Sequence, residues 1–368
     1  MKVVTAEAPE KEHAGVLLIR ADAGERIGVG HVFRCLALAQ AWQDAGGRAV
    51  FLIAPGAGQV ATTLRKENIE IATLSSIPGS STDAKELIEL SRAVAASWIV
   101  IDGYDFDSEY QRQLRDSKVP IVVIDDLGSL PAYFSNVVVN PNLGAQEIRY
   151  NVSRDARLLL GTEYTLLRRE FRGHPALNRP IATKVRNILI TMGGADPDNV
   201  TGTILRSVAA TTLSRVTINV VIGPNNRHER EIQMLLETLS LHVLLKTNVP
   251  AMSDLIAKAD LCITAGGVTC WECASLGVPM LVLAIAANQV RNVQTLGKLD
   301  CALSLGCADD ATTDGIASAI LQLVHELALR MRLSDNCRRL VDGGGAARVV
   351  QQLKAYTNRY FPLHREVT

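Results

Sequence analysis

The sequence of 368 residues has few aromatic side chains, no excess of charge and no long apolar run. Aromatic residues make up 4% of it, so the core must consist mainly of Ala, Val, Leu and Ile. The 38 basic side chains balance 38 acidic ones, which disfavours sequence-independent binding to nucleic acid or to an anionic membrane. No apolar segment reaches the ~18 residues of a membrane-spanning helix. A globular protein without nucleic-acid or membrane partners is expected.

Other signals are missing as well. Residues 1–15 contain no apolar stretch of the kind that a secretory signal needs, and the seven cysteines are an odd number, so we expect a reducing, cytoplasmic setting. Cys270 and Cys273 form a CxxC pair, but no second pair or histidines follow at the spacing of a zinc site. We interpret them as two small buried residues of a helix. The GxSxG, P-loop and HExxH motifs are absent, which disfavours hydrolysis through serine or zinc.

What the sequence contains is a regular alternation of short apolar runs with helical patterns. Apolar runs without polar alternation are typical of parallel strands that are covered on both faces. Such strands are predicted at 16–19, 49–53, 98–101, 121–124 and 137–139, and again at 187–191, 217–222, 242–245, 261–264 and 280–284. The predicted fold class is α/β, with two Rossmann-like domains whose parallel sheets face each other across a cleft.

A charged, proline-containing stretch separates the two groups of strands. We therefore expect an N-terminal domain over 1–167, a linker over 168–186 and a C-terminal domain over 187–345. A final helix and tail occupy 346–368, and the helix, predicted at 346–356, is expected to pack back on the first domain. Ligands of such sheets bind beyond the carboxyl ends of the strands, so the loops at those ends contain the candidate residues.

In the first half, the glycine turn Gly28-Val29-Gly30 lies between the first strand and a helix near 30–45. Glycines there allow a ligand to approach the backbone, although the third glycine of a dinucleotide fingerprint is missing. His31 follows directly, where it could act as a general base in a cleft. It could equally be a helix cap or a histidine satisfied within the core.

In the second half, two glycine pairs follow strands, and a helix start with free N–H groups can hold a diphosphate. Glu272 lies about one and a half turns into the second helix, where it could accept both ribose hydroxyls or simply compensate the helix dipole. The candidate nucleotide-binding residues are Gly193, Gly194, Gly266, Gly267, Val268, Thr269 and Glu272.

Further polar residues follow other strands. Asn288 and Gln289 form an amide pair that can bond sugar hydroxyls in both directions. Asp102-Gly103-Tyr104 and the pair Asp125-Asp126 end two strands of the first half, and either could face the cleft. Adjacent residues at a strand end point in opposite directions, so a two-metal site at Asp125 and Asp126 is disfavoured.

The segments IRADA (19–23), IGVGH (27–31) and RCLALA (34–39) strongly resemble the UDP-sugar hydrolases of the pseudaminic acid pathway. That family removes UDP from UDP-2,4-diacetamido-2,4,6-trideoxy-β-L-altropyranose and adopts the GT-B fold. The resemblance continues in order through 124–126, 140–142, 164–171, 192–196 and 265–272, and covers about residues 15–355.

The resemblance implies that His31 is the catalytic base, which activates water to attack the anomeric carbon with inversion. It implies that Glu272 binds the ribose and that the glycine pairs line the diphosphate. Tyr104 matches a family tyrosine near the sugar, and Asn288 matches a cleft asparagine. We expect substrate contacts from Gly28, Gly30, Arg34, Tyr104, Asn288 and Gln289. Trp271 departs from the polar residue of some relatives, and either alters a contact near the ribose or packs inward.

Three functions are compatible with this sequence. The first is hydrolysis of a UDP-linked diacetamido sugar for a surface glycan, as in flagellin glycosylation, without cofactor or metal. The second is a GT-B glycosyltransferase that moves the sugar to an acceptor. The third is a nucleotide-sugar-binding protein without catalysis. A monomer is the expected state, because the cleft between two domains must open and close.

Overall fold

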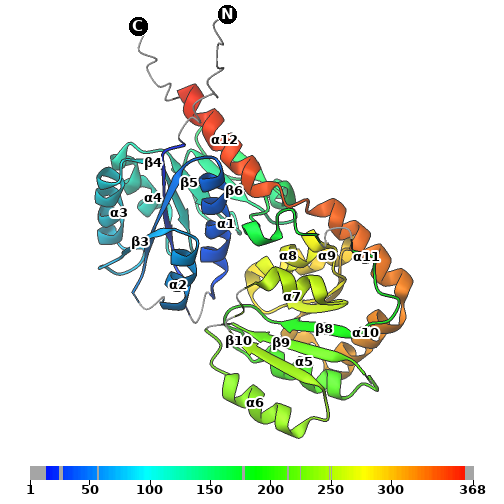
Figure 1. Cartoon of the computed structure of the whole chain (residues 1–368). Coiled ribbons are helices and arrows are strands. Elements are labelled where there is room, and N and C mark those ends of the chain that lie inside the picture. The colour runs from blue at the N-terminus through cyan, green and yellow to red at the C-terminus, as the bar shows by residue number, and fades with distance from the viewer. Residues whose placement is uncertain are drawn as a thin grey trace, which may run out of the picture.

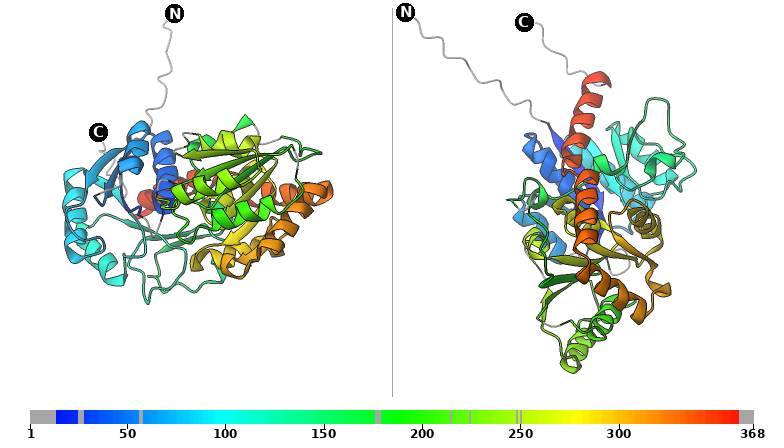
Figure 2. Two further views of the ribbon diagram at one scale, coloured as in Figure 1. Left: turned by 90° about the horizontal axis from the view of Figure 1, so that it is seen from below. Right: turned by 90° about the vertical axis from the view of Figure 1, so that its right-hand side faces the viewer.

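The computed structural model describes residues 14–24, 28–55, 58–175, 179–213, 215–223, 225–247, 249 and 251–360 (Figure 1). Ile27 of the IGVGH segment, residues 1–13, residues 176–178 of the predicted linker and the tail 361–368 lie outside these ranges. Two α/β halves lie side by side, and the chain returns to the first half at its end (Figures 1 and 2).

The N-terminal half contains a parallel sheet of order β3-β2-β1-β4-β5-β6-β7. Its central strands form because each contributes an apolar run that helices cover on both faces. The strands are β1 (Val16–Ala21), β2 (Arg48–Ile53), β3 (Glu70–Thr73), β4 (Ala96–Asp102), β5 (Ile121–Ile124), β6 (Val137–Asn140) and β7 (Arg157–Leu160). The helices are α1 (Gly30–Asp44), α2 (Gly58–Lys66), α3 (Ser81–Ala93) and α4 (Ser108–Leu114).

The C-terminal half contains a second parallel sheet, of order β10-β9-β8-β11-β12-β13. Its strands are β8 (Asn187–Thr191), β9 (Thr217–Ile222), β10 (Val243–Thr247), β11 (Leu261–Ala265), β12 (Met280–Ala284) and β13 (Leu303–Cys307). The helices are α5 (Val200–Ala209), α6 (Glu229–Thr238), α7 (Met252–Lys258), α8 (Val268–Leu276), α9 (Val290–Lys298), α10 (Thr313–His325) and α11 (Leu327–Leu340). The predicted fold class is therefore confirmed.

All ten strands predicted from apolar runs are present, most within two residues of their expected bounds. Three further strands, β3, β7 and β13, escaped prediction. Each lies at the edge of its sheet and is partly exposed, and β3 and β13 contain small or polar residues in place of a continuous apolar run. An edge strand pairs with a neighbour on one side only and is more exposed to solvent, so its sequence is less continuously apolar.

The last helix, α12 (Gly345–Tyr360), packs against α1 of the first half, as expected from the sequence. Val349, Leu353 and Tyr356 belong to the core between α1 and the N-terminal sheet. In Figure 1 and in the right view of Figure 2, α11 and α12 run in succession from the second half along the first. The chain therefore connects the two halves twice.

The predicted linker is packed against both halves. Arg169 donates to Asp44 of α1, and Phe171 is 1% exposed in the core of the second half. Its charged side chains make specific contacts in the described part of the segment.

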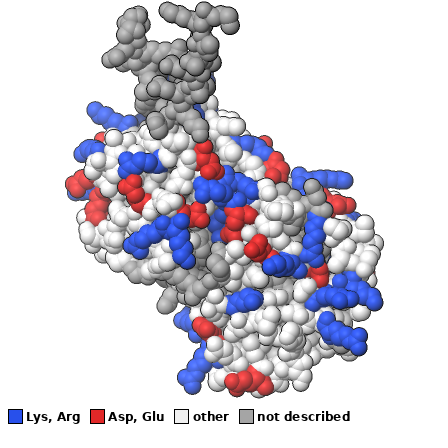
Figure 3. All heavy atoms as spheres, in the orientation of Figure 1, with Lys and Arg blue, Asp and Glu red and all other residues white. Residues whose placement is uncertain are grey.

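In each sheet the order of strands reverses at one point, between β1 and β4 and between β8 and β11. Parallel sheets bind ligands at such switch points. On the face shown in Figure 3, basic and acidic side chains are interspersed over both halves. Among the described residues, no helix has the length and apolarity that a bilayer crossing requires.

Candidate active site

A cleft of about 810 Å³ lies where the switch points of the two sheets face each other. Its walls include the loop after β1 and the start of α1 on one side, and the loops after β8, β11 and β12 on the other. This volume is within the range of small-molecule sites. All residues to which the sequence assigns a catalytic, nucleotide-binding or substrate-binding role line this cleft, whereas Asp102 and Asp125 do not.

His31 is the second residue of α1, which follows β1 after a loop. Its Nδ1 lies 2.7 Å from Oδ1 of Asp102, the last residue of β4, so residues 71 positions apart meet at the switch point. The cap of α1 is Val29, which excludes a capping role for the histidine. Since Asp102 engages Nδ1, Nε2 is the nitrogen that can accept a proton from a ligand in the cleft.

Arg34, one turn further along α1, holds the same carboxylate with two bonds of 2.6 Å, from Nε to Oδ2 and from Nη2 to Oδ1. Burial opposes ionisation of Asp102, but the charges of Arg34 and His31 outweigh it, and the pKa of Asp102 lies well below its usual value. Burial also disfavours the charge of Arg34, yet Asp102 and Asp126 raise its pKa well above the ordinary value. Arg34 thus fixes the aspartate that orients His31. This role does not require Arg34 to contact a ligand.

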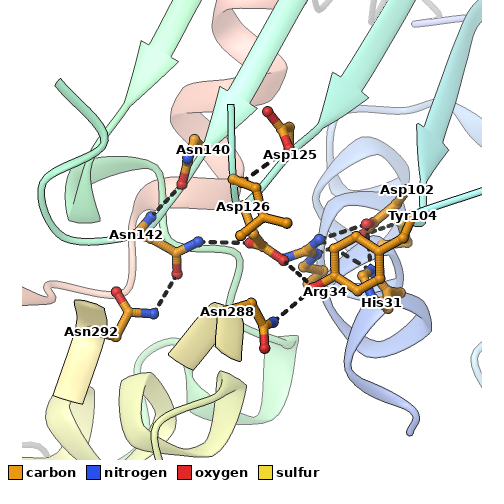
Figure 4. A network of polar contacts seen from close by, with 12 residues as sticks. His31, Arg34, Asp102, Tyr104, Asp125, Asp126, Asn140, Asn142, Asn288 and Asn292 are labelled. Carbon is orange, nitrogen blue, oxygen red and sulfur yellow. Dashed lines mark hydrogen bonds and ion pairs between the residues drawn. The ribbon is translucent and has the colours of Figure 1, made fainter. Parts of the chain in front are cut away.

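Asp126 follows β5 and accepts three bonds on a side chain that is 6% exposed. Arg34 Nη1 donates at 2.6 Å, Asn142 Nδ2 at 2.6 Å and the Tyr104 hydroxyl at 3.2 Å (Figure 4). Its neighbour Asp125 points the other way and accepts from the backbone of the following loop and from Tyr133. The two carboxylates therefore do not form a joint site.

Two of these side chains reach the second half of the molecule. The Tyr104 hydroxyl accepts from Asn288 Nδ2 at 2.7 Å, and Asn142 Oδ1 accepts from Asn292 Nδ2 of α9 at 2.8 Å. The rings of Tyr104 and His31 also make a T-shaped contact, with ring centroids 4.9 Å apart. Tyr104 and Asn288, which the family resemblance singled out, thus bond to each other and bridge the cleft beside His31.

The opposite wall is formed by the start of α8. Gly267 is its N-cap, with no side chain that accepts from the first turn, and Val268 and Thr269 line the cleft. Free N–H groups at a helix start favour an anion. A Cβ on Gly266 would lie 2.4 Å from Val293 of α9, so glycine there lets this loop pack closely.

Glu272, in the second turn of α8, is 3% exposed and accepts from Arg168 Nη2 at 2.8 Å. Burial raises the pKa of Glu272 above its usual value, and Arg168 partly offsets this. The guanidinium of Arg168 also lies over the rings of Phe33 and Phe171, at 4.9 and 5.3 Å from their centroids. Arg168 therefore links the candidate ribose residue to α1, the helix that contains His31.

The loop after β8 differs from a phosphate-binding helix start. Asp196 accepts from the N–H groups of Val200 and Thr201 at 2.8 and 3.0 Å, so its own carboxylate occupies the beginning of α5. Gly193 and Gly194 line the cleft, but a Cβ on Gly194 would lie 2.9 Å from the backbone nitrogen of Val29. Gly194 is thus a close contact between the two halves, and an anion at this loop would have to use groups other than the start of α5.

The remaining candidate residues differ in their contacts and in their burial. Gln289 uses its side-chain oxygen on the N–H of Ile285, 3.1 Å away, while Gly28 has φ +67° and faces Gly194. Trp271 is 4% exposed and packs in the core of the second half, although one face lines the cleft. Cys270 and Cys273 are both fully buried, as interpreted from the sequence. Within the described part of the chain, no group of three or more potential metal ligands occurs.

Sequence reasoning did not assign roles to Asp102, Asp126, Asn142, Asn292 or Arg168. Asp102 and Asp126 do follow apolar strands, and that position was the available signal. Nothing in the sequence pairs Asp102 with a histidine 71 positions away. Arg168 was hidden because its segment has the composition of a linker.

Three comparisons with known proteins agree with this architecture. Residues 187–338 match the family model of the glycosyltransferase family 28 C-terminal domain. SpsG of Bacillus subtilis, a spore coat polysaccharide biosynthesis protein, is 23% identical over 350 residues, covering 93% of this chain and 98% of SpsG. The UDP-2,4-diacetamido-2,4,6-trideoxy-β-L-altropyranose hydrolase of Campylobacter jejuni is 24% identical over 220 residues, or 59% of this chain and 73% of the hydrolase. An uncharacterized protein of Methanocaldococcus jannaschii is 24% identical over 274 residues, which cover 73% of this chain and 55% of that protein.

Solved structures of similar shape include MurG of Acinetobacter baumannii, with a TM-score of 0.63 and 17% identity over 92% of this chain and 99% of MurG. The spinosyn rhamnosyltransferase SpnG with thymidine diphosphate has a TM-score of 0.65 and 17% identity, over 92% of this chain and 99% of SpnG. MnaA of S. aureus with UDP has a TM-score of 0.66 and 14% identity, over 94% and 97%. At these identities the likeness shows the fold.

The fold and the cleft define a protein of the GT-B class. Within that class, the sequence matches relate the chain to enzymes of nucleotide-sugar metabolism.

Proposed function

We propose that this protein hydrolyses a UDP-linked sugar, with His31 as the general base and the start of α8 as the diphosphate site. The observation that carries the proposal is the His31–Asp102 pair, which lies across one cleft from an uncapped helix start. A base on one wall and an anion site on the other match a substrate with a reactive carbon next to a diphosphate. The resemblance in the first domain and the Campylobacter relative support hydrolysis as the reaction.

The proposed step is a single displacement at the anomeric carbon. A water oxygen attacks C1 from the face opposite the diphosphate, and Nε2 of His31 takes a proton from that water. The bond between C1 and the phosphate oxygen breaks, and UDP leaves with the bonding electron pair and the oxygen. The free sugar carries the new hydroxyl with inverted configuration. Asp102 stabilises the imidazolium that forms, and backbone N–H groups of α8 stabilise the leaving diphosphate.

The side of the cleft formed by α8 suits the nucleotide. Glu272 is buried, ion-paired and fixed in the second turn, where it can accept ribose hydroxyls. Recognition by backbone N–H groups needs no excess of basic side chains, which agrees with the balanced charge of the chain.

The finer identity of the sugar rests on the resemblance alone. We propose UDP-2,4-diacetamido-2,4,6-trideoxy-β-L-altropyranose, used without cofactor by a cytoplasmic monomer in the synthesis of a surface glycan such as that of flagellin. Asn288 and Tyr104, which bond to each other beside His31, are the groups placed to bind such a sugar. Stereoisomers of this sugar are the first alternatives to test.

The experiment is a proton NMR time course with candidate UDP-diacetamido sugars in water enriched in ¹⁸O, without any acceptor, followed by mass spectrometry of both products. We expect free sugar and UDP in equal amounts, the inverted anomer as first product, and ¹⁸O in the sugar. ¹⁸O in the phosphate would mean cleavage of the P–O bond and would contradict the proposed step.

A glycosyltransferase is the second candidate, favoured by the family match of residues 187–338. It would use the same base and nucleotide site and differ in the attacking group. Slow or absent release of sugar from the UDP-sugar alone, with rapid turnover once an acceptor is added, would identify it.

A further inference from the structure

His31 lies in a compact group of buried charges. The charged and titratable side chains around it are Asp102, Arg34, Asp126 and Tyr104, with Cys35 donating to Asp102 at 3.4 Å. Burial and Asp126 raise the pKa of Tyr104, and burial and Asp102 raise that of Cys35, so both stay neutral. Among the described residues, the fixed charges of this group are therefore two carboxylates and one guanidinium.

Arg34 divides its guanidinium between the two carboxylates. Nε and Nη2 hold Asp102, while Nη1 holds Asp126, each at 2.6 Å. Nη2 also lies 3.1 Å from His31 Nδ1, so a positive charge stands next to the ring that must become positive. Asp102 alone would only cancel Arg34. The second carboxylate leaves the group with one negative charge when His31 is neutral, and with none when His31 is protonated.

We propose that Asp126 is a positioning residue that acts on His31 through Arg34. Its carboxylate supplies the counter-charge that the imidazolium of His31 needs. Asp126 does not touch the imidazole in this arrangement. The inference rests on the proposed function for its catalytic meaning, but its electrostatic content concerns the free protein alone.

The surroundings of Asp126 support a fixed and ionised carboxylate. Burial opposes its charge, yet Arg34 outweighs burial and lowers the pKa of Asp126 below its usual value. Asn142 and Tyr104 also donate to this carboxylate, Asn142 to Oδ1 and Tyr104 to Oδ2. An ionised side chain at this depth interacts with its neighbours much more strongly than in water.

Residues from both halves of the protein hold the side chain of Asp126 in position. Its partners Asn142 and Tyr104 are in turn held by Asn292 and Asn288 from the opposite half (Figure 4). Contacts between the two halves therefore hold both of these hydrogen-bond partners of Asp126 in place.

The test is the protonation midpoint of His31 in the free protein, followed by NMR on histidine-labelled samples. The chain has seven histidines, and the signal that disappears in His31→Gln identifies the residue. In Asp126→Asn we expect the midpoint to move to lower pH by about one unit. Asp125→Asn is the matched control, since it makes the same change one residue away on a carboxylate that faces another loop. It should leave the midpoint unchanged.

Turnover supplies a second readout. In Asp126→Asn the acid limb of kcat/KM should move in the same direction, and kcat should fall about tenfold or more. Asp126→Glu should restore part of both, since it keeps the charge. Asp126→Ser provides a second neutral variant if Asp126→Asn does not fold, and thermal unfolding checks each protein.

The outcomes separate the two proposals. A wild-type protein that releases no sugar from any UDP-sugar contradicts the proposed function and leaves the midpoint test intact. A folded neutral variant whose His31 midpoint equals that of the wild type overturns the role of Asp126, even if its turnover is lower.

Discussion

Replacement of His31 by alanine tests the division of labour between the two walls of the cleft. Loss of a general base lowers turnover by about 10²- to 10⁴-fold, which corresponds to about 3 to 5 kcal/mol in the activation free energy. Nucleotide affinity should stay within about threefold of the wild type, because the start of α8 lies on the other half and shares no bond with His31.

The substitution is also mild enough to interpret. His31 contributes one bond to Asp102, whose oxygens keep two bonds from Arg34. The expected loss in the free energy of unfolding is about 1.5 to 3 kcal/mol, the range of a hydrogen bond to a charged group. The variant should therefore remain folded at room temperature, with Asp102 still paired.

The assay combines UDP release from the UDP-sugar with calorimetric titration of UDP. His242→Ala, an exposed histidine in the second half, controls for the loss of an imidazole elsewhere. Turnover of His31→Ala within tenfold of the wild type would refute the assignment of the base. Loss of UDP binding in a folded variant would refute the separation of the two walls.

Three further predictions concern acid stability, the ribose and the contact between the halves. Because the folded state lowers the pKa values of Asp102 and Asp126, the stability that these carboxylates confer is present above their unfolded pKa near 4 and is lost as the pH falls below it. The urea concentration at the midpoint of unfolding should therefore be lower at pH 3 than at pH 5. This difference should be smaller in Asp102→Asn. Glu272→Gln should weaken UDP binding about tenfold and reduce the preference for UDP over 2′-deoxy-UDP in calorimetry, whereas an unchanged preference would argue against a ribose contact. Gly194→Ala places a Cβ 2.9 Å from the nitrogen of Val29 and should lower kcat/KM about tenfold, with thermal unfolding as the check on folding; full activity would show that the two loops separate freely.

The sequence allowed the sheets to be predicted well, since the buried strands β1, β5, β8, β11 and β12 consist of short runs of mostly apolar residues. The three missed strands lie at sheet edges, where partial exposure permits polar and small residues, whereas the fourth edge strand, β10, was predicted from its apolar run. Local pattern thus predicted those strands that contain a continuous apolar run.

In the site, too, some features could be predicted from the sequence and others could not. The position of His31 after a glycine turn and a strand was enough to suggest a base, because topology places that loop at the cleft. Its orientation by Asp102 could not be predicted, since it depends on the strand order, which puts β4 next to β1. The packing of Asp196 on the start of α5 likewise depends on a loop conformation that glycine content alone does not reveal.

The packing of α12 on the first half has a consequence for synthesis on the ribosome. The core beside α1 includes Val349, Leu353 and Tyr356, and Trp98 of β4 donates to Thr357 at 3.0 Å. These partners are translated after the whole second half. The domain that contains His31 is thus begun first and completed last, and until then the nascent chain lacks the residues that cover this apolar side of α1.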